Sequence, residues 1–242
     1  MKALPLLALC LFAACQTPRL ESEPWANATP GTHSLGAGAG WGWAKFDLNL
    51  EGTSGFLDGM TGEDGADLEP KLGGTIRYQY VATDQLRLGA ALSVRRVQPD
   101  DVAPLGIGAI LPRFKGKRFT TFHLIFQPRW YFDPIGESKR WRAFAGIDLA
   151  WIPKVDIDGD VVYGGGVTEP LKFRGDDYFT IAPVVGGSYQ LTDRWTFDFG
   201  AFYEIPLGES KDELPLLIVA STVSAEVNHE GLLIFWNFSY SF

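Results

Sequence analysis

Charged side chains at alternate positions of short apolar segments are the residues of this sequence best placed to carry chemistry. The eight that we single out are Arg77, Arg87, Arg95, Arg129, Arg142, Asp148, Asp198 and Glu204. Alternate residues of a β-strand point to opposite faces of a sheet, so these charges would share a polar face. Because an unpaired charge away from bulk water is costly, we expect them to form a network of ion pairs. The alternative, since five arginines accompany three carboxylates, is an anion-selective path.

A second acidic group lies between two of these segments. Asp156, Asp158 and Asp160 alternate around Gly159, and carboxylate oxygens at such spacing are ligands that Ca²⁺ accepts. The downstream Glu of an EF-hand loop is missing, with Thr at 168 and Glu only at 169. A solvated acidic segment is therefore favoured over a metal site, and no cofactor is expected.

A basic cluster precedes the segment that begins near residue 121. Its members are Arg113, Lys115, Lys117 and Arg118. Guanidinium and ammonium groups bind phosphate oxygens, so contact with lipopolysaccharide phosphates is one interpretation. The other is ordinary solubility of a surface loop.

Histidine, the commonest catalytic base, occurs only at 33, 123 and 229. His229 and Glu230 lie close in the sequence to Ser224 and Glu226, and together these residues could form a Ser/His/acid set. The residues around them match no known motif of lipid-modifying barrel enzymes. His123 lies among polar residues that can form hydrogen bonds with it. We predict that the protein is not an enzyme and has no catalytic residues.

The segments that would position these side chains alternate apolar and polar residues with a period of two, which indicates β-strands. The eight segments are 35–50, 72–80, 86–95, 121–132, 142–151, 179–190, 195–205 and 232–242. In the first, the apolar face changes parity after Trp43, which predicts a β-bulge near Ala44 and Lys45. Glycines at 36, 38, 40 and 42 predict a stripe of small residues that lets the wall curve.

The connections alternate in length. Those at 82–85, 134–139 and 192–194 are short, whereas 52–69, 97–117, 156–176 and 207–229 are long. Short turns on one side and long loops on the other are typical of a transmembrane β-barrel. The expected fold is therefore all-β: an eight-stranded antiparallel transmembrane barrel over 34–242, with short periplasmic turns and long extracellular loops.

The end of the chain carries a family resemblance. Trp236, Phe238, Tyr240 and Phe242 alternate up to the last residue, which resembles the sorting signature read by the barrel assembly machinery. Segments 78–86 and 187–195 each consist of a strand, a Thr-Asp turn and the start of the next strand. They resemble the small outer-membrane barrels of the A and W types. The resemblance implies a bacterial outer-membrane location, with membrane lipid, lipopolysaccharide and the assembly machinery as partners. It leaves the oligomeric state open.

The beginning of the chain predicts export. Residues 1–14 have the layout of a signal peptide, with Lys2 before an apolar stretch. The run from Leu11 to Cys15 resembles a bacterial lipobox, with Phe12 where Leu is usual, so Cys15 is predicted to be lipidated; the alternative is an ordinary leader cut nearby. Residues 15–33, rich in Pro and polar residues, are expected to form a flexible tether.

Composition and strand number limit the classes of function that the protein can have. The net charge of −8 argues against a nucleic-acid binder, which needs a basic surface. Eight strands leave an interior that side chains can fill, which favours a structural or surface-interaction role. The apolar stretch 214–220 keeps a narrow channel for small or hydrophobic solutes as the alternative, because exposed apolar residues usually have a partner. A strand extension packed on neighbouring loops would explain this stretch without transport.

The lipidation hypothesis makes a direct prediction. Cys15→Ser should abolish acylation and processing by the lipoprotein signal peptidase, because the thiol is the acylated group. Mass spectrometry of the mature N-terminus, with and without globomycin, measures this. Unchanged processing in both cases would leave the ordinary leader as the explanation.

Overall fold

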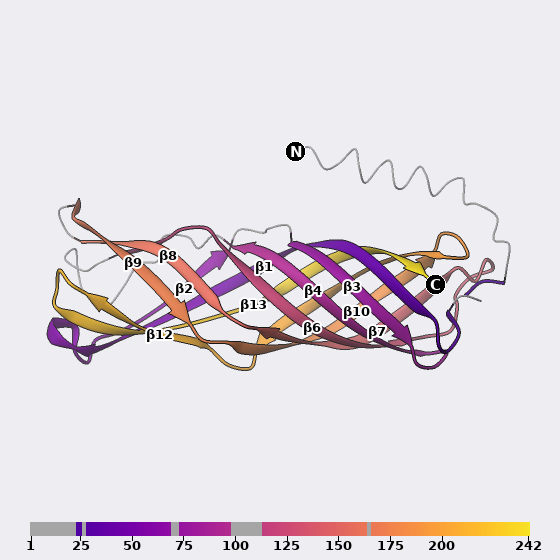
Figure 1. The fold of residues 1–242 in the computed structure, drawn as a ribbon, viewed down its shortest axis with the longest axis horizontal. Coiled ribbons are helices and arrows are strands. Elements are labelled where there is room, and N and C mark those ends of the chain that lie inside the picture. Colours follow the sequence, from indigo (N-terminus) through magenta and orange to yellow (C-terminus); the bar gives the residue numbers. More distant parts are fainter. Residues whose placement is uncertain (1–22, 26–27, 69–72, 98–112, 164–165) are drawn as a thin grey trace.

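The computed structural model describes residues 23–25, 28–68, 73–97, 113–163 and 166–242, without the side chains of 44–48, 62–68, 113–114 and 229. Eight strands form an antiparallel barrel: β1 (His33–Ser54), β3 (Gly73–Val81), β4 (Leu86–Val97), β6 (Phe119–Tyr131), β7 (Trp141–Ile152), β10 (Tyr178–Gln190), β11 (Trp195–Pro206) and β13 (Ser221–Ser241). Each pairs with its neighbour, and β13 pairs back with β1, which closes the barrel (Figure 1). The predicted fold class is confirmed. The predicted signal peptide and Cys15 lie outside the described residues.

The outer surface of the barrel is apolar. Side chains that point away from the axis remain largely exposed, among them Leu35, Ile76, Phe126, Val185 and Ile234. A belt of this size would aggregate in water, so lipid must cover it. The short turns lie at the end where the chain terminates, and this is the periplasmic side. No helix in the described part of the chain is long and apolar enough to cross a bilayer.

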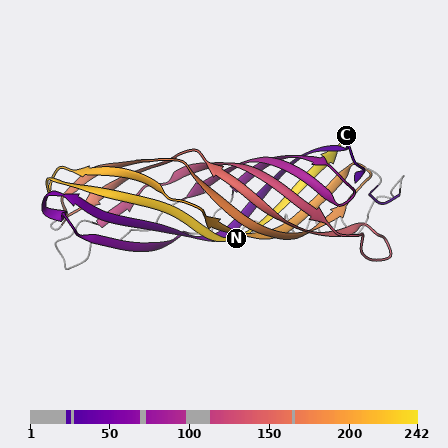
Figure 2. The ribbon, with the colours of Figure 1, turned by 90° about the horizontal axis from the view of Figure 1, so that it is seen from below.

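The long extracellular connections are largely β-structure rather than loops. They contain the helical turn η3 (Gly55–Leu57) and strands β2 (Thr61–Leu68), β5 (Arg113–Gly116), β8 (Val155–Val162), β9 (Thr168–Gly175) and β12 (Ser210–Leu216). Strands β2 and β12 pair with the outer halves of β1 and β13, while β5, β8 and β9 form a separate sheet. Figure 2 shows this extension continuing the long axis of the barrel, at the end away from the C-terminus.

These extracellular strands enclose an apolar cluster of their own, which we call the extracellular core. It includes Ile157, Phe173, Leu214, Leu216 and Val223, all at most 5% exposed. Two residues of the apolar stretch 214–220 are therefore buried in a strand extension, whereas Leu217 and Ile218 at the hairpin tip are 80% and 50% exposed.

The predicted bulge near Ala44 and Lys45 is wrong. The pairing of β1 with β13 continues without a shift from Ser34 to Gly52, and the irregularity lies between Gly52 and Ser54. The apolar pattern changes parity for another reason. Beyond the membrane the inward face of β1 meets the extracellular core, against which Leu50 packs, so apolar residues move to the face that was polar inside the barrel.

The glycine stripe of β1 lets two strands approach closely. A Cβ added to Gly36, Gly38 or Gly42 would collide with backbone atoms of β13. The space that these glycines leave is taken by inward side chains of β13, including Asn237 and Leu233. Glycine is therefore needed here for packing across the seam between the first and last strands.

The last residue completes that seam, which predicts a role in assembly. The backbone N–H of Phe242 donates to the His33 carbonyl at 2.9 Å, and the His33 N–H donates back at 3.2 Å. Deleting Phe242 should reduce insertion, because it removes both bonds and the terminal aromatic ring. Outer-membrane yield and heat-modifiable gel mobility measure this, with Phe242→Tyr as the control that keeps both features. Equal yields for the deletion and the control would contradict the prediction.

Candidate functional site

The eight charged residues singled out in the sequence all lie on inward positions of the barrel strands. Seven are buried, and Arg95 is 13% exposed. Six of them lie at two levels along the axis. We call Arg77, Arg129, Asp148 and Asp198 the periplasmic layer, and Arg95 and Glu204 the extracellular layer. Arg87 and Arg142 lie nearer the periplasmic mouth.

The periplasmic layer contains two ion pairs. Arg77 donates to Asp198, which also accepts from Ser188. The same nitrogen of Arg77, Nη2, also donates to Ser239 Oγ at 3.2 Å. Strands β3 and β11, which carry the Arg77 pair, are not neighbours in the sheet, so this ion pair bridges the barrel interior.

The second pair of this layer is shared. Arg129 Nη2 lies 3.3 Å from Asp148 Oδ2, and Gln127 Nε2 donates to the same oxygen at 2.6 Å. The Arg129 guanidinium carbon also lies over two aromatic rings, 5.1 Å from the centroids of Phe144 and Phe235. Packing on ring faces stabilises its charge without satisfying its N–H groups.

The extracellular layer is centred on Glu204. Its carboxylate accepts from Arg95 and, at 2.9 Å, from Thr180 Oγ1. His123 is fully buried beside it, with Nδ1 3.6 Å from Glu204 Oε1 and Nε2 3.0 Å from Thr121 Oγ1. The layer therefore joins β4, β6, β10 and β11 across the interior.

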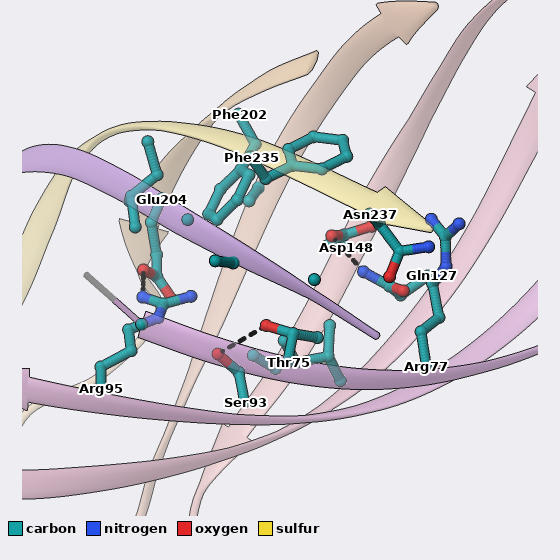
Figure 3. Close-up of a pocket in the computed structure, with 18 of the residues that line it drawn as sticks. Thr75, Arg77, Ser93, Arg95, Gln127, Asp148, Phe202, Glu204, Phe235 and Asn237 are labelled. Atoms are coloured by element: carbon teal, nitrogen blue, oxygen red, sulfur yellow. Dashed lines mark hydrogen bonds and ion pairs between the residues drawn. The ribbon is translucent and has the colours of Figure 1, made fainter. Parts of the chain in front are cut away.

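A cavity of about 70 Å³ lies between the two layers (Figure 3). Its walls are mostly apolar, from Ile125, Ala150, Phe202, Leu233 and Phe235, and β1 contributes only small residues there, Gly38 to Gly40. Arg95 and Glu204 line one end, while Arg77, Gln127 and Asp148 line the other, as the labelled side chains in Figure 3 show. We call this cavity the central chamber.

The periplasmic mouth is occupied by Trp25, from the segment predicted to be a flexible tether. Trp25 is 6% exposed; its backbone N–H donates to Gln190 Oε1 at 2.6 Å and its indole N–H to the Lys139 carbonyl at 2.8 Å. The guanidinium carbons of Arg87 and Arg142 lie 5.8 and 5.6 Å from its ring. Part of this segment is therefore packed against the barrel.

Arg87 and Arg142 differ in how they are satisfied. Arg142 donates to the carbonyls of Phe132 and Asp84, both at 2.9 Å. Arg87 lies over the ring of Tyr131, 4.0 Å from its centroid. The sequence prediction of a network thus corresponds to three ion pairs, one arginine held by carbonyls and one held by aromatic rings.

The acidic group 156–160 lies on strand β8, with the carboxylates on the exposed face of the three-stranded sheet. Cations from neighbouring positions meet them: Lys154 lies 3.2 Å from Asp156, Arg174 2.6 Å from Asp158, and Lys117 3.3 Å from Asp160. The hydrogen bond from Arg174 lowers the pKa of Asp158. Within the described residues no group of three acidic, His or Cys side chains is arranged to hold a metal ion.

The predicted basic cluster is spread over β5 and the residues after it. Lys115 and Arg118 are exposed and Lys117 is engaged with Asp160, while the side chain of Arg113 lies outside the described part. Of the Ser/His/acid set, Glu226 forms an ion pair with Lys211, and the side chain of His229 is likewise not described.

Glu169 joins two extracellular hairpins, a role that the sequence analysis missed. This carboxylate is 7% exposed and accepts from Tyr163 Oη at 2.8 Å and from the backbone N–H groups of Leu217 and Ile218 at 2.7 and 3.3 Å. Burial raises the pKa of Glu169, but these hydrogen bonds outweigh it and lower the pKa overall. The two backbone groups turn inward, which leaves the side chains of Leu217 and Ile218 outward.

Other contributors were missed because they are neutral. Gln127, Thr180, Ser188 and Ser239 complete the interior network, and their positions on the polar face were the only available signal. Trp25 also had a signal in the sequence, since a tryptophan is unusual in a polar, Pro-rich segment.

Comparison with known proteins shows the fold. No protein-family model and no curated protein matches the chain. Among solved structures, the outer-membrane protein OprG from Pseudomonas aeruginosa is similar at 11% identity and a TM-score of 0.57, covering 93% of this chain and 99% of that one. The outer-membrane protein AlkL is 16% identical with a TM-score of 0.48, covering 93% and 94%. The Escherichia coli protease OmpT is 12% identical with a TM-score of 0.46, covering 88% and 98%.

The closed barrel, its apolar exterior and the similarity to OprG together show the fold of an outer-membrane β-barrel. At these identities the comparison extends to architecture alone. The role of the protein must be argued from its own interior and surface.

The burial of the interior ion pairs predicts their effect on stability. Asp198→Asn should lower the free energy of unfolding by about 3 kcal/mol or more, because it leaves the Arg77 charge buried without a counter-charge. Asp158→Asn, which alters an exposed pair, should leave stability nearly unchanged. Urea unfolding in lipid vesicles, followed by tryptophan fluorescence, compares the two variants. Equal effects would show that the interior pair is not the stabilising element.

Proposed function

We propose that this protein is a non-conducting outer-membrane barrel with a structural or surface-interaction role, whose working part is the extracellular β-structure. The observation that carries the proposal is the obstruction of the interior. Trp25, the periplasmic layer, the extracellular layer and the extracellular core follow one another along the axis. An eight-stranded barrel has so little free cross-section that cross-barrel ion pairs are enough to close it.

The construction of the extracellular part supports the surface role. Its sheets enclose a core and Glu169 fixes two hairpins to each other, so the outward residues Leu217 and Ile218 are held in place. Apolar residues displayed rigidly beyond the membrane usually serve contact with a partner. Exposed Lys115 and Arg118 offer lipopolysaccharide phosphates a contact nearer the membrane.

The proposal includes no catalytic activity. In the described part of the chain Glu226 is committed to Lys211, and His123 is enclosed by Thr121 and Glu204 inside the barrel. His123 therefore faces no surface where a substrate could meet it, and the part-exposed carboxylate of Glu226 is held in an ion pair.

One observation favours a narrow channel as the second candidate. The central chamber is an apolar space in the middle of the barrel, and Gly38 and Gly40 leave its β1 wall without large side chains. Small or hydrophobic solutes could occupy such a space if the extracellular layer opened.

Planar-bilayer recording separates the two candidates. We expect the purified protein to give no stable conductance steps. As a matched pair, Glu204→Arg alters the extracellular layer and Glu213→Gln alters only an exposed position on β12. Stable steps in the unmodified protein that change with Glu204→Arg, but not with Glu213→Gln, would overturn the closed-barrel proposal.

A cellular assay separates the structural from the surface role. In a strain lacking the gene, restored exclusion of a hydrophobic dye measures envelope integrity. If the tip acts through contact, the variant with Leu217→Ser and Ile218→Ser should assemble normally but fail to restore exclusion. Full restoration by this variant would assign the role to the barrel itself.

A further inference from the structure

We propose that the barrel interior binds a small monovalent anion beside Arg129, at the periplasmic end of the central chamber. This inference goes beyond the proposed function, because binding of an anion in the interior does not depend on whether the extracellular surface contacts a partner. The argument rests on charge balance, on unsatisfied donors and on the space available.

The periplasmic half of the interior contains more buried positive than negative charge. Arg77, Arg87, Arg129 and Arg142 are at most 6% exposed, and the buried carboxylates with them are Asp148 and Asp198. Arginine cannot escape this imbalance by losing its proton, because it is always protonated in proteins. A buried charge must therefore find a counter-charge or donate to strong acceptors.

Two of the four arginines donate to strong acceptors. Arg77 has its own carboxylate, Asp198. Arg142 donates to two backbone carbonyls near the mouth. Arg129 has a carboxylate partner, Asp148, whereas Arg87, which lies directly opposite Arg129 across β4 and β6, has none among the described residues. Because carbonyls carry no net charge, the net positive charge of this half comes from Arg87 and Arg142.

Arg129 is the best placed of the four for a ligand. Its one carboxylate, Asp148, is shared with Gln127, and its Nε and Nη1 have no hydrogen-bond partner among the described residues. The rings of Phe144 and Phe235 lie near its guanidinium group. Arg87 Nη2 is also without a partner in the described part of the chain, and its charge adds to the positive potential.

The space beside Arg129 limits the size of the ligand. Arg129 lines the central chamber, whose volume of about 70 Å³ has room for only a few water-sized groups. Gln127 Oε1 lines the same chamber and has no donor among the described residues. A halide, nitrate or formate ion on Arg129, with one water donating to Gln127, meets these requirements. Sulfate and phosphate are excluded, because apolar walls cannot replace their hydration.

Bromide is the probe for this site. Crystals of the whole protein soaked in sodium bromide should show an anomalous peak beside Arg129, and bromide should raise the unfolding temperature at constant ionic strength more than sulfate does. Water alone at this position, with no bromide peak, would overturn the proposal.

Two variants move the affinity in opposite directions. Asp148→Asn removes the competing carboxylate and should tighten bromide binding at least tenfold, whereas Arg129→Gln should weaken it at least tenfold. Asp158→Asn, on the extracellular surface, controls for general effects of charge and should change nothing. If Arg129→Gln fails to assemble, Asp148→Asn still decides the matter. A bromide affinity unaltered by Asp148→Asn would identify an adventitious ion and overturn the proposal.

Discussion

The pairing of β1 with β13 is the constraint on which the rest of the structure depends. These two strands are about twice as long as a membrane crossing requires, and they stay in register from Ser34 to Gly52. Their inner halves close the barrel, so no edge remains exposed to lipid. Their outer halves recruit β2 and β12. One continuous seam therefore provides both barrel closure and the foundation of the extracellular sheets.

The interior changes character along that seam. On β13 the inward residues are Ser239 and Asn237 near the periplasm, Phe235 and Leu233 in the middle, and Val227 and Val223 outside the membrane. Inside the membrane a polar interior must satisfy itself, because the surrounding lipid offers no hydrogen bonds. Outside the membrane, water surrounds the sheets, and an apolar core becomes the stable solution. The inward face of the same strand therefore changes from polar near the periplasm to apolar outside the membrane.

This change explains what could be predicted from the sequence. Within the membrane, an apolar outward face and a polar inward face give an unambiguous period of two, so the barrel strands and the inward positions of all eight charges were predictable. Beyond it the polarity inverts, and the same alternation was interpreted as a bulge in β1 and as an acidic segment in β8. Yet Val155, Ile157 and Val161 alternate with the aspartates, which is the pattern of a strand with a buried apolar face.

Pairing across the interior could not be predicted in the same way. Residues such as Arg77 and Asp198, 121 positions apart, meet because closure sets their level along the axis, and no local pattern encodes that level. The burial of Trp25 could not be predicted for a related reason, since it depends on a mouth formed by the turns that contain Lys139 and follow Gln190.

The barrel and the extracellular sheets share residues and therefore act as one body. Phe119, Ile152 and Tyr178 belong to barrel strands β6, β7 and β10, yet their side chains lie in the extracellular core. The extracellular layer lies just inside the level of these residues, and Thr180, two positions from Tyr178, donates to Glu204. Continuous packing therefore joins the extracellular hairpins, through the core, to the interior carboxylate of Glu204. The same packing would hold both the outward hairpin tips and the interior network that the proposed function requires.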